Sequence, residues 1–79
     1  MDMRALVGRN VKRIRERKGL TQEKFAELSG FSQQYISGLE NGRRNPSIVT
    51  IYELSKALGV SHMDLSRPKG GHASEPILG

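Results

Sequence analysis

Apolar residues recur near the start of the chain at intervals of three and four, the spacing that places side chains on one face of a helix. Val7, Val11 and Ile14 follow this spacing, which predicts a helix over about residues 4–18 with one narrow apolar face. Gly19 follows a last turn rich in basic residues, which is typical of a helix C-terminus. No segment alternates apolar and polar residues for long enough to predict a strand.

A second, shorter helix is predicted to begin after Thr21, because threonine is a good N-cap. Phe25, Ala26 and Leu28 are expected to supply its apolar contacts. Gly30 is expected to end this helix with a positive φ, which glycine adopts at little cost.

A third helix is predicted over about residues 32–40, with Ser32 as its N-cap and with Ile36 and Leu39 facing the core. Residues 41–46, which follow it, carry strong turn signals. Two short helices joined by a tight turn at a glycine are typical of a helix-turn-helix.

A fourth helix is predicted from about Ser47 to Gly59. Its apolar residues keep the helical period: Ile48, Ile51, Leu54 and Leu58. Ser61 and Asp64 fit the capping-box pattern, which predicts a short fifth helix over about residues 61–66.

The chain of 79 residues leaves room for one domain. We therefore expect an all-α, compact five-helix domain over residues 1–66, followed by a flexible tail over 67–79, where Gly, Pro and polar residues dominate. The sequence has no cysteine, no apolar run long enough to span a bilayer and no signal-peptide pattern. These features lead us to expect a cytoplasmic protein with no membrane contact.

The charge balance favours an anionic partner. The chain has 13 Lys and Arg against 8 Asp and Glu, a formal net charge of +5, and nucleic acid is the commonest partner of such a protein. A basic protein that is merely soluble would show the same balance.

The sequence offers no metal or catalytic site. No other candidate ligand lies at metal-site spacing from His62 or His72, and we see no catalytic arrangement. We expect no enzyme activity, metal, cofactor or small-molecule ligand.

The stretch over residues 19–47, GLTQEKFAELSGFSQQYISGLENGRRNPS, closely resembles the phage-repressor and Cro family of helix-turn-helix regulators, also called the xenobiotic-response-element family. The matching pieces are Gly-Leu-Thr-Gln at 19–22, Phe-Ala at 25–26, Gly-Phe-Ser at 30–32, Ile-Ser at 36–37 and Glu-Asn-Gly at 40–42. The resemblance extends over roughly residues 6–66. It implies a lambda-repressor-like fold and a transcriptional regulator that binds double-stranded operator DNA.

By this resemblance, the helix at about 32–40 is the recognition helix, which lies in the major groove. Gln33 and Gln34 occupy its first turn, and a glutamine amide can pair with adenine N6 and N7. Ser37, one turn further on, can reach a base or a phosphate. Gly38 departs from family members that carry a base-reading side chain there, so we expect a smaller footprint in that direction.

Several other residues are candidates for phosphate contact. Gln22 lies in the first turn of its helix, where free N–H groups and the helix dipole favour a phosphate. The matching family glutamine holds a phosphate, often while touching the first glutamine of the recognition helix. Tyr35 either contacts DNA, by stacking on a sugar or donating to a phosphate, or covers the flank of the domain. The remaining candidates are Asn41, Arg43 and Arg44 in the loop, and Arg9, Asn10 and Arg13 on the first helix.

The resemblance assigns Arg15 and Glu40 a structural role, as a partly buried ion pair that joins the first helix to the end of the third. It also implies a homodimer on a palindromic operator, because a single helix-turn-helix reads too few base pairs to select a site in a genome. The candidate dimer interface comprises Val60, Met63 and Leu65, beside Tyr52 or the residues around Ile48. Val60 and Leu65 are expected to fill the core at least in part, which leaves Met63 facing the partner.

The sequence leaves several kinds of regulator open. Tyr35-Ile36-Ser37-Gly38 and Arg44-Asn45 resemble the controller proteins of restriction–modification systems, whereas a short autonomous repressor fits equally well. The chain is also compatible with the DNA-binding part of a longer regulator. An antitoxin-type interaction module that binds its own promoter is the alternative from another class. Activation and repression are not distinguished.

Overall fold

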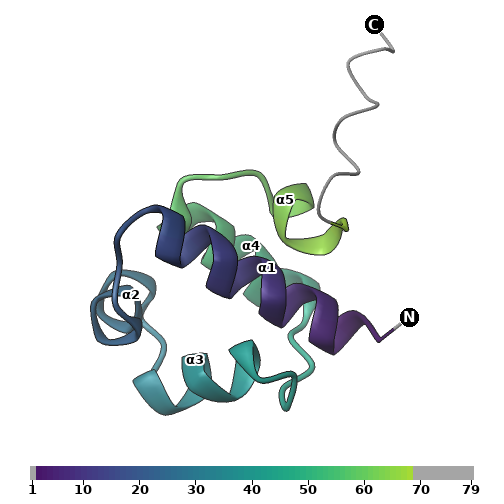
Figure 1. Ribbon diagram of the computed structural model, residues 1–79, viewed down its shortest axis with the longest axis horizontal. Coiled ribbons are helices and arrows are strands. Elements are labelled where there is room, and N and C mark those ends of the chain that lie inside the picture. Colours follow the sequence, from purple (N-terminus) through teal and green to yellow (C-terminus); the bar gives the residue numbers. More distant parts are fainter. Residues whose placement is uncertain (1, 69–79) are drawn as a thin grey trace, which may run out of the picture.

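The computed structural model describes residues 2–68, which form five α-helices joined by short connections (Figure 1). The helices are α1 (Met3–Arg17), α2 (Gln22–Ser29), α3 (Gln33–Glu40), α4 (Ile48–Leu58) and α5 (His62–Ser66). The all-α, five-helix prediction is confirmed. Most of the predicted tail lies outside the described residues, so its boundary stays a prediction. In the described part, no helix has the length and apolar character needed to cross a bilayer.

Each helix begins at a side chain that accepts a hydrogen bond from a backbone N–H of the first turn. These caps are Asp2, Thr21, Ser32, Ser47 and Ser61. Ser61 and Asp64 form the predicted capping box. Gly30 and Gly59 end α2 and α4 with φ of 84° and 72°, the left-handed conformation that glycine adopts without a Cβ clash.

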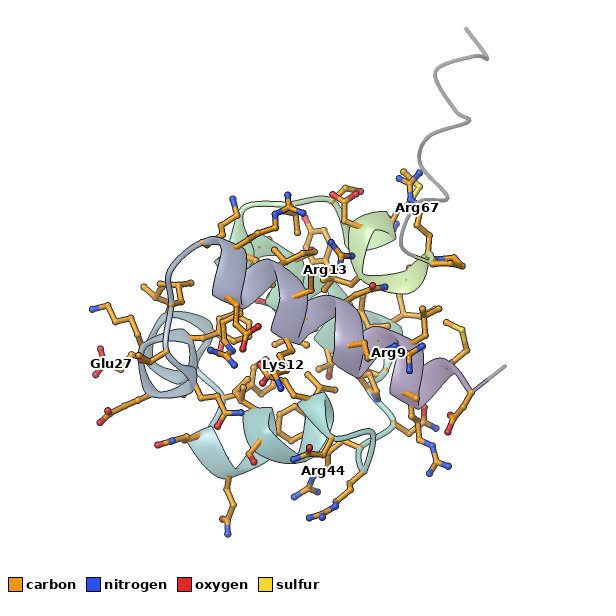
Figure 2. All side chains as sticks on the ribbon, in the orientation of Figure 1. Arg9, Lys12, Arg13, Glu27, Arg44 and Arg67 are labelled. Atoms are coloured by element: carbon orange, nitrogen blue, oxygen red, sulfur yellow. The ribbon has the colours of Figure 1, made fainter. Side chains whose placement is uncertain are left out.

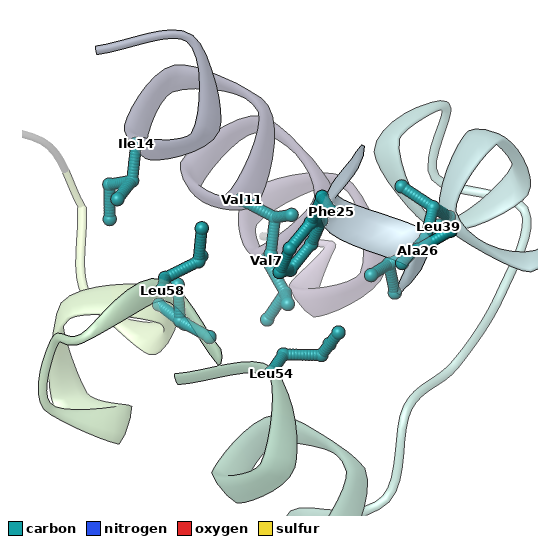
Figure 3. Close-up of a cluster of buried hydrophobic side chains, with 10 residues drawn as sticks. Val7, Val11, Ile14, Phe25, Ala26, Leu39, Leu54 and Leu58 are labelled. Carbon is teal, nitrogen blue, oxygen red and sulfur yellow. The ribbon is translucent and has the colours of Figure 1, made fainter. Parts of the chain in front are cut away.

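The core lies between α1, which packs against α3, α4 and α5, and α2, which packs against α3 and α4 (Figure 3). Its buried side chains are Val7, Val11, Ile14, Phe25, Ala26, Ile36, Leu39, Leu54, Leu58 and Leu65. The expectation for Leu28 is wrong, because its side chain is 53% exposed. The buried arc of α2 lies between Phe25 and Ala26, and at 100° per residue Leu28 falls outside that arc.

The contact between α1 and α3 is unusually close at Gly8. A Cβ placed at Gly8 would collide with the backbone carbonyl oxygen of Leu39. The end of α3 therefore packs against the backbone of α1, which fixes where the outer face of α3 lies.

Asn10 joins α1 to α5. Its Nδ2 donates to the carbonyl oxygens of Leu65 and Arg67, both at 2.8 Å, and its side chain is almost completely buried. The phosphate contact expected for Asn10 is therefore wrong, since buried backbone carbonyls near the end of the domain occupy its amide.

Candidate nucleic-acid interface

The outer face of α3 is open to solvent at the edge of the molecule (Figure 1). Ile36 and Leu39 are fully buried on the inner face, as predicted. Gln33 and Gln34 are exposed on the first turn, and Ser37 is half-buried one turn later. The two amides and the hydroxyl follow one another along a rod about 12 Å long, which is a dimension that suits the major groove.

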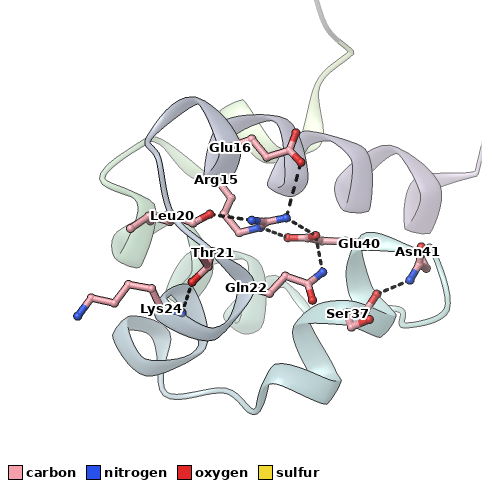
Figure 4. A network of polar contacts seen from close by, with 9 residues as sticks. All are labelled: Arg15, Glu16, Leu20, Thr21, Gln22, Lys24, Ser37, Glu40 and Asn41. Carbon is pink, nitrogen blue, oxygen red and sulfur yellow. Dashed lines mark hydrogen bonds and ion pairs between the residues drawn. The ribbon is translucent and has the colours of Figure 1, made fainter.

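Arg15 and Glu40 form the expected ion pair, which joins α1 to the last residue of α3 (Figure 4). Arg15 Nε lies 2.7 Å from Glu40 Oε2, and Nη2 lies 3.0 Å from Oε1. A third guanidinium nitrogen, Nη1, donates to the Leu20 carbonyl oxygen at 2.7 Å. The hydrogen bonds to Glu40 raise the pKa of the Arg15 guanidinium above its usual value. Both side chains are buried, so the pair positions α3 and is closed to DNA.

Gln22 belongs to the same network. Its Nε2 donates to Glu40 Oε1 at 2.9 Å, whereas the family resemblance implied a contact with Gln33. This bond occupies one amide hydrogen and leaves the second available as a donor. Gln22 is half-buried at the N-terminus of α2, where the helix dipole favours an anion. Glu40 thus orients an amide at the position expected to meet a phosphate.

The chain turns back onto α3 immediately after that helix ends. Gly42, with φ of 75°, donates its N–H to the Leu39 carbonyl at 3.0 Å, and the Arg43 N–H donates to the Gly38 carbonyl at 2.8 Å. These two bonds form a Schellman motif. Asn41 Nδ2 donates to the Ser37 carbonyl at 2.9 Å (Figure 4). The loop is therefore tied to α3 and its exposed cations lie beside the recognition surface.

Arg44 and Tyr35 contact one another across this turn. The guanidinium carbon of Arg44 lies 5.4 Å from the centroid of the Tyr35 ring, and that ring stacks on Phe31 at 5.1 Å between centroids. Of the two roles considered for Tyr35, the half-buried ring has the flank-covering one. Whether its hydroxyl also meets a phosphate stays a prediction.

Arg13 lies apart from the loop cations. Its Nη2 donates to Asn10 Oδ1 at 3.0 Å, on the side of α1 that faces α5, and Figure 2 shows Arg13 near α5 but Arg44 beside α3. The structure thus groups Gln22, Asn41, Arg43 and Arg44 around α3 and leaves Arg13 outside the group. A phosphate contact by Arg13 stays a prediction.

The predicted dimer residues differ in accessibility. Leu65 has no exposed surface, so its assignment to an interface is wrong: it completes the core between α5 and α1. Val60 is half-buried against that core, and Met63 is 53% exposed. A larger apolar surface occurs on α4, where Ile48, Val49 and Tyr52 are 83%, 69% and 52% exposed.

We refer to Ile48, Val49 and Tyr52 as the α4 apolar face, because their spacing places them together on one side of the helix. The expectation that Ile48 continues the core period is wrong. Helix α4 begins at Ile48, and the buried arc is instead set by Leu54 and Leu58. At 100° per residue, Ile48 lies about 120° around the helix from Leu54, which puts it outside the buried arc.

The exposed groups around α3 are amides, hydroxyls and guanidinium groups, which hydrogen-bond to base edges and phosphates. Within residues 2–68, no three His, Cys, Asp or Glu side chains gather in a way that could hold a metal ion. The arrangement is suited to recognition by hydrogen bonds and charge.

Comparison with known proteins supports this interpretation. The model of a helix-turn-helix family (HTH_3) matches residues 11–65. An uncharacterized HTH-type transcriptional regulator of Sinorhizobium fredii, y4dJ, is 63% identical over 68 residues, covering 86% of this chain and 88% of its own length.

Two solved structures are also similar. The hypothetical transcription factor NHTF from Neisseria superposes with a TM-score of 0.86 at 32% identity, covering 92% of this chain and 84% of that one. The restriction–modification controller protein C.Esp1396I, solved as a tetramer in complex with its natural 35-base-pair operator, has a TM-score of 0.75 at 35% identity, covering 82% and 86%. From the α2–turn–α3 geometry and these matches, we conclude that the chain belongs to the helix-turn-helix family of transcriptional regulators.

Proposed function

We propose that the protein is a transcriptional regulator that binds double-stranded operator DNA sequence-specifically, with α3 in the major groove. The observation that carries the proposal is the exposed outer face of α3, where the side chains of Gln33 and Gln34 are exposed and take no part in the core. The proposed function involves no catalytic step. Its proposed site of action is the cytoplasm, as expected for a DNA-binding regulator similar to bacterial ones.

The groups flanking α3 supply the phosphate contacts in this proposal. Gln22 lies at one end of the helix-turn-helix, held by Glu40, and the loop with Asn41 and Arg43 lies at the other. Donors that flank a recognition helix can contact the phosphates that border the major groove. Such contacts set the register of α3, while Gln33 and Gln34 read adenine edges.

The proposed active form is a homodimer on a palindromic operator. C.Esp1396I, a similar protein, was solved as a tetramer on its operator, which supports an oligomeric mode for this chain. The α4 apolar face is the best candidate interface, because three large apolar side chains stand in solvent there and contiguous exposed apolar surface marks interaction sites. A two-fold dimer would place two α3 helices about 34 Å apart, one turn of DNA.

Selection of bound sequences from a random pool of duplex DNA tests the proposed function. We expect enrichment of one palindromic sequence whose half-site centres are about 10 base pairs apart. A protein that binds the pool but enriches no sequence would contradict the proposal. An enriched sequence without two-fold symmetry would contradict the dimer alone.

A further inference from the structure

The side chain of Arg44 occupies the space that a side chain at position 38 would take. A Cβ built on Gly38 would meet Arg44 Nε at 3.3 Å and Cγ at 3.4 Å. These are the nearest atoms to that Cβ apart from the helix itself. The stem of Arg44 therefore crosses the outer face of α3 directly over the bare backbone of Gly38.

The backbone turn after α3 brings Arg44 to this place. In the Schellman motif, the Arg43 N–H is bonded to the Gly38 carbonyl, so the next residue begins beside Gly38. The Tyr35 ring, one turn earlier on α3, then receives the guanidinium on its face. Phe31 stacks on the Tyr35 ring, which holds the aromatic surface in place.

The N–H donors of the Arg44 guanidinium remain available although the guanidinium lies over the Tyr35 ring. A cation–π contact uses none of the N–H groups as hydrogen-bond donors, and these groups point outward in the plane of the guanidinium. Within residues 2–68, the Arg44 guanidinium has no hydrogen-bond or ion-pair partner. Arg15, by contrast, uses three nitrogens on acceptors within the protein.

Position 38 lies four residues after Gln34, on the same row of the helix surface. A donor group held there is presented on the outer face of α3, one turn beyond Gln34. An arginine edge pairs bidentately with guanine O6 and N7, and a side chain that is already positioned loses less entropy on binding.

We propose that Arg44 reads a guanine in each half-site, in place of the side chain that Gly38 lacks. This inference rests on the proposed function and deepens it. It gives Arg44 a base contact where the sequence predicted a phosphate contact, and it supplies the base-reading group whose absence at Gly38 predicted a smaller footprint. Gly38 leaves the space that the Arg44 side chain occupies, and Tyr35 is a positioning residue for the Arg44 guanidinium.

The test is sequence selection from random duplex DNA with the wild type and four variants, each first checked for folding by circular dichroism. Arg44→Ala and Arg44→Lys remove the planar guanidinium, and Gly38→Leu fills the space over position 38 while keeping Arg44. Arg43→Ala is the matched control, because it removes an equal charge from the adjacent residue. Affinities are then measured for the enriched site and for a site with the guanine replaced.

The wild type should prefer the guanine site by about 10- to 100-fold, the value of one bidentate contact. Both Arg44 variants and Gly38→Leu should lose that preference at the same single position of each half-site. Arg43→Ala should weaken all sequences alike and keep the wild-type ranking. If Arg44→Ala behaves like Arg43→Ala, or if Gly38→Leu keeps the preference, the inference is wrong. Absence of any enrichment by the wild type would instead contradict the proposed function itself.

Discussion

Arg15 and Gln22 both donate hydrogen bonds to the buried carboxylate of Glu40. The same carboxylate therefore holds α3 in position and orients the amide of Gln22, a candidate phosphate ligand. Its Oε2 accepts from Arg15 Nε at 2.7 Å, and its Oε1 accepts from both Arg15 Nη2 and Gln22 Nε2. The outer face of α3 cannot shift relative to α1 without breaking these bonds. The rigidity of the recognition surface therefore originates in the interior of the domain.

Replacing Glu40 by Ala should lower the free energy of unfolding by about 3–5 kcal/mol, because it leaves the buried Arg15 charge without its partner. Urea unfolding followed by circular dichroism measures this loss. Glu23→Ala, at an exposed acid on α2, is the control and should change stability by no more than about 1 kcal/mol. Equal effects of the two substitutions would show that the pair does not stabilise the fold.

The loss of unfolding free energy caused by Glu40→Ala should be independent of pH between 7 and 9. The hydrogen bonds to Glu40 raise the pKa of Arg15. A group with a raised folded-state pKa contributes fully below its unfolded pKa, and the contribution is lost only as pH rises through the folded value. For an arginine, that window lies far above pH 9. A marked fall in the Glu40→Ala effect by pH 9 would contradict this.

Two helical glycines should respond differently to substitution by alanine. Gly8→Ala should destabilise by about 1–3 kcal/mol, because its Cβ collides with the fixed carbonyl of Leu39. Gly38→Ala should be neutral or stabilising by up to about 1 kcal/mol, since alanine favours a helix and the Arg44 side chain can give way. Thermal unfolding of both variants provides the comparison. Similar melting temperatures would contradict the close α1–α3 approach.

The helices were predictable because their caps and stops are local signals. Thr21, Ser32 and Ser61 cap where the sequence indicated, and Gly30 has the expected positive φ. The direction of each helix face was harder to predict. Leu28 is exposed because the arc that α2 buries depends on its partners, which no local pattern records.

Polar residues were misjudged where their partners are distant in sequence. Asn10 bonds to carbonyls 55 and 57 residues away, so its burial could not be inferred from the basic surroundings of α1. The position of Arg44 over Gly38 arises from a backbone turn and an aromatic ring together. The family resemblance supplied the pairing of Arg15 with Glu40, which spacing alone would not have indicated.

A charge on the α4 apolar face should dissociate the proposed dimer. Tyr52→Glu places a carboxylate among Ile48 and Val49, which would have to be desolvated on association. Leu28→Glu is the matched control, because Leu28 and Tyr52 are 53% and 52% exposed on different helices. Sedimentation at micromolar concentration should show a dimer for the wild type and Leu28→Glu, and a monomer for Tyr52→Glu.

A monomeric wild type, both free and on DNA, would contradict the dimer. If Tyr52→Glu remains a dimer, Met63→Glu tests the exposed α5 side chain that the sequence predicted to face the partner. Dissociation by Met63→Glu alone would move the interface from α4 to α5.

Gln33→Ala and Gln34→Ala should relax sequence preference, each at one or two base pairs. The loss of a bidentate contact to adenine should cost about 1–3 kcal/mol in specific binding and much less in binding to unrelated DNA. Fluorescence anisotropy with the enriched duplex and with point variants of it measures both. If neither variant changes the ranking of sequences, the base-reading residues lie elsewhere on α3.

The most direct test of sequence-specific DNA binding is the affinity ratio between the enriched duplex and a scrambled duplex of equal composition, measured over a series of salt concentrations. Both affinities should fall steeply with salt, because phosphate contacts release counterions. The enriched duplex should remain at least about 1,000-fold tighter at physiological salt. Equal affinities for the two duplexes, or an affinity that does not change with salt, would contradict the account.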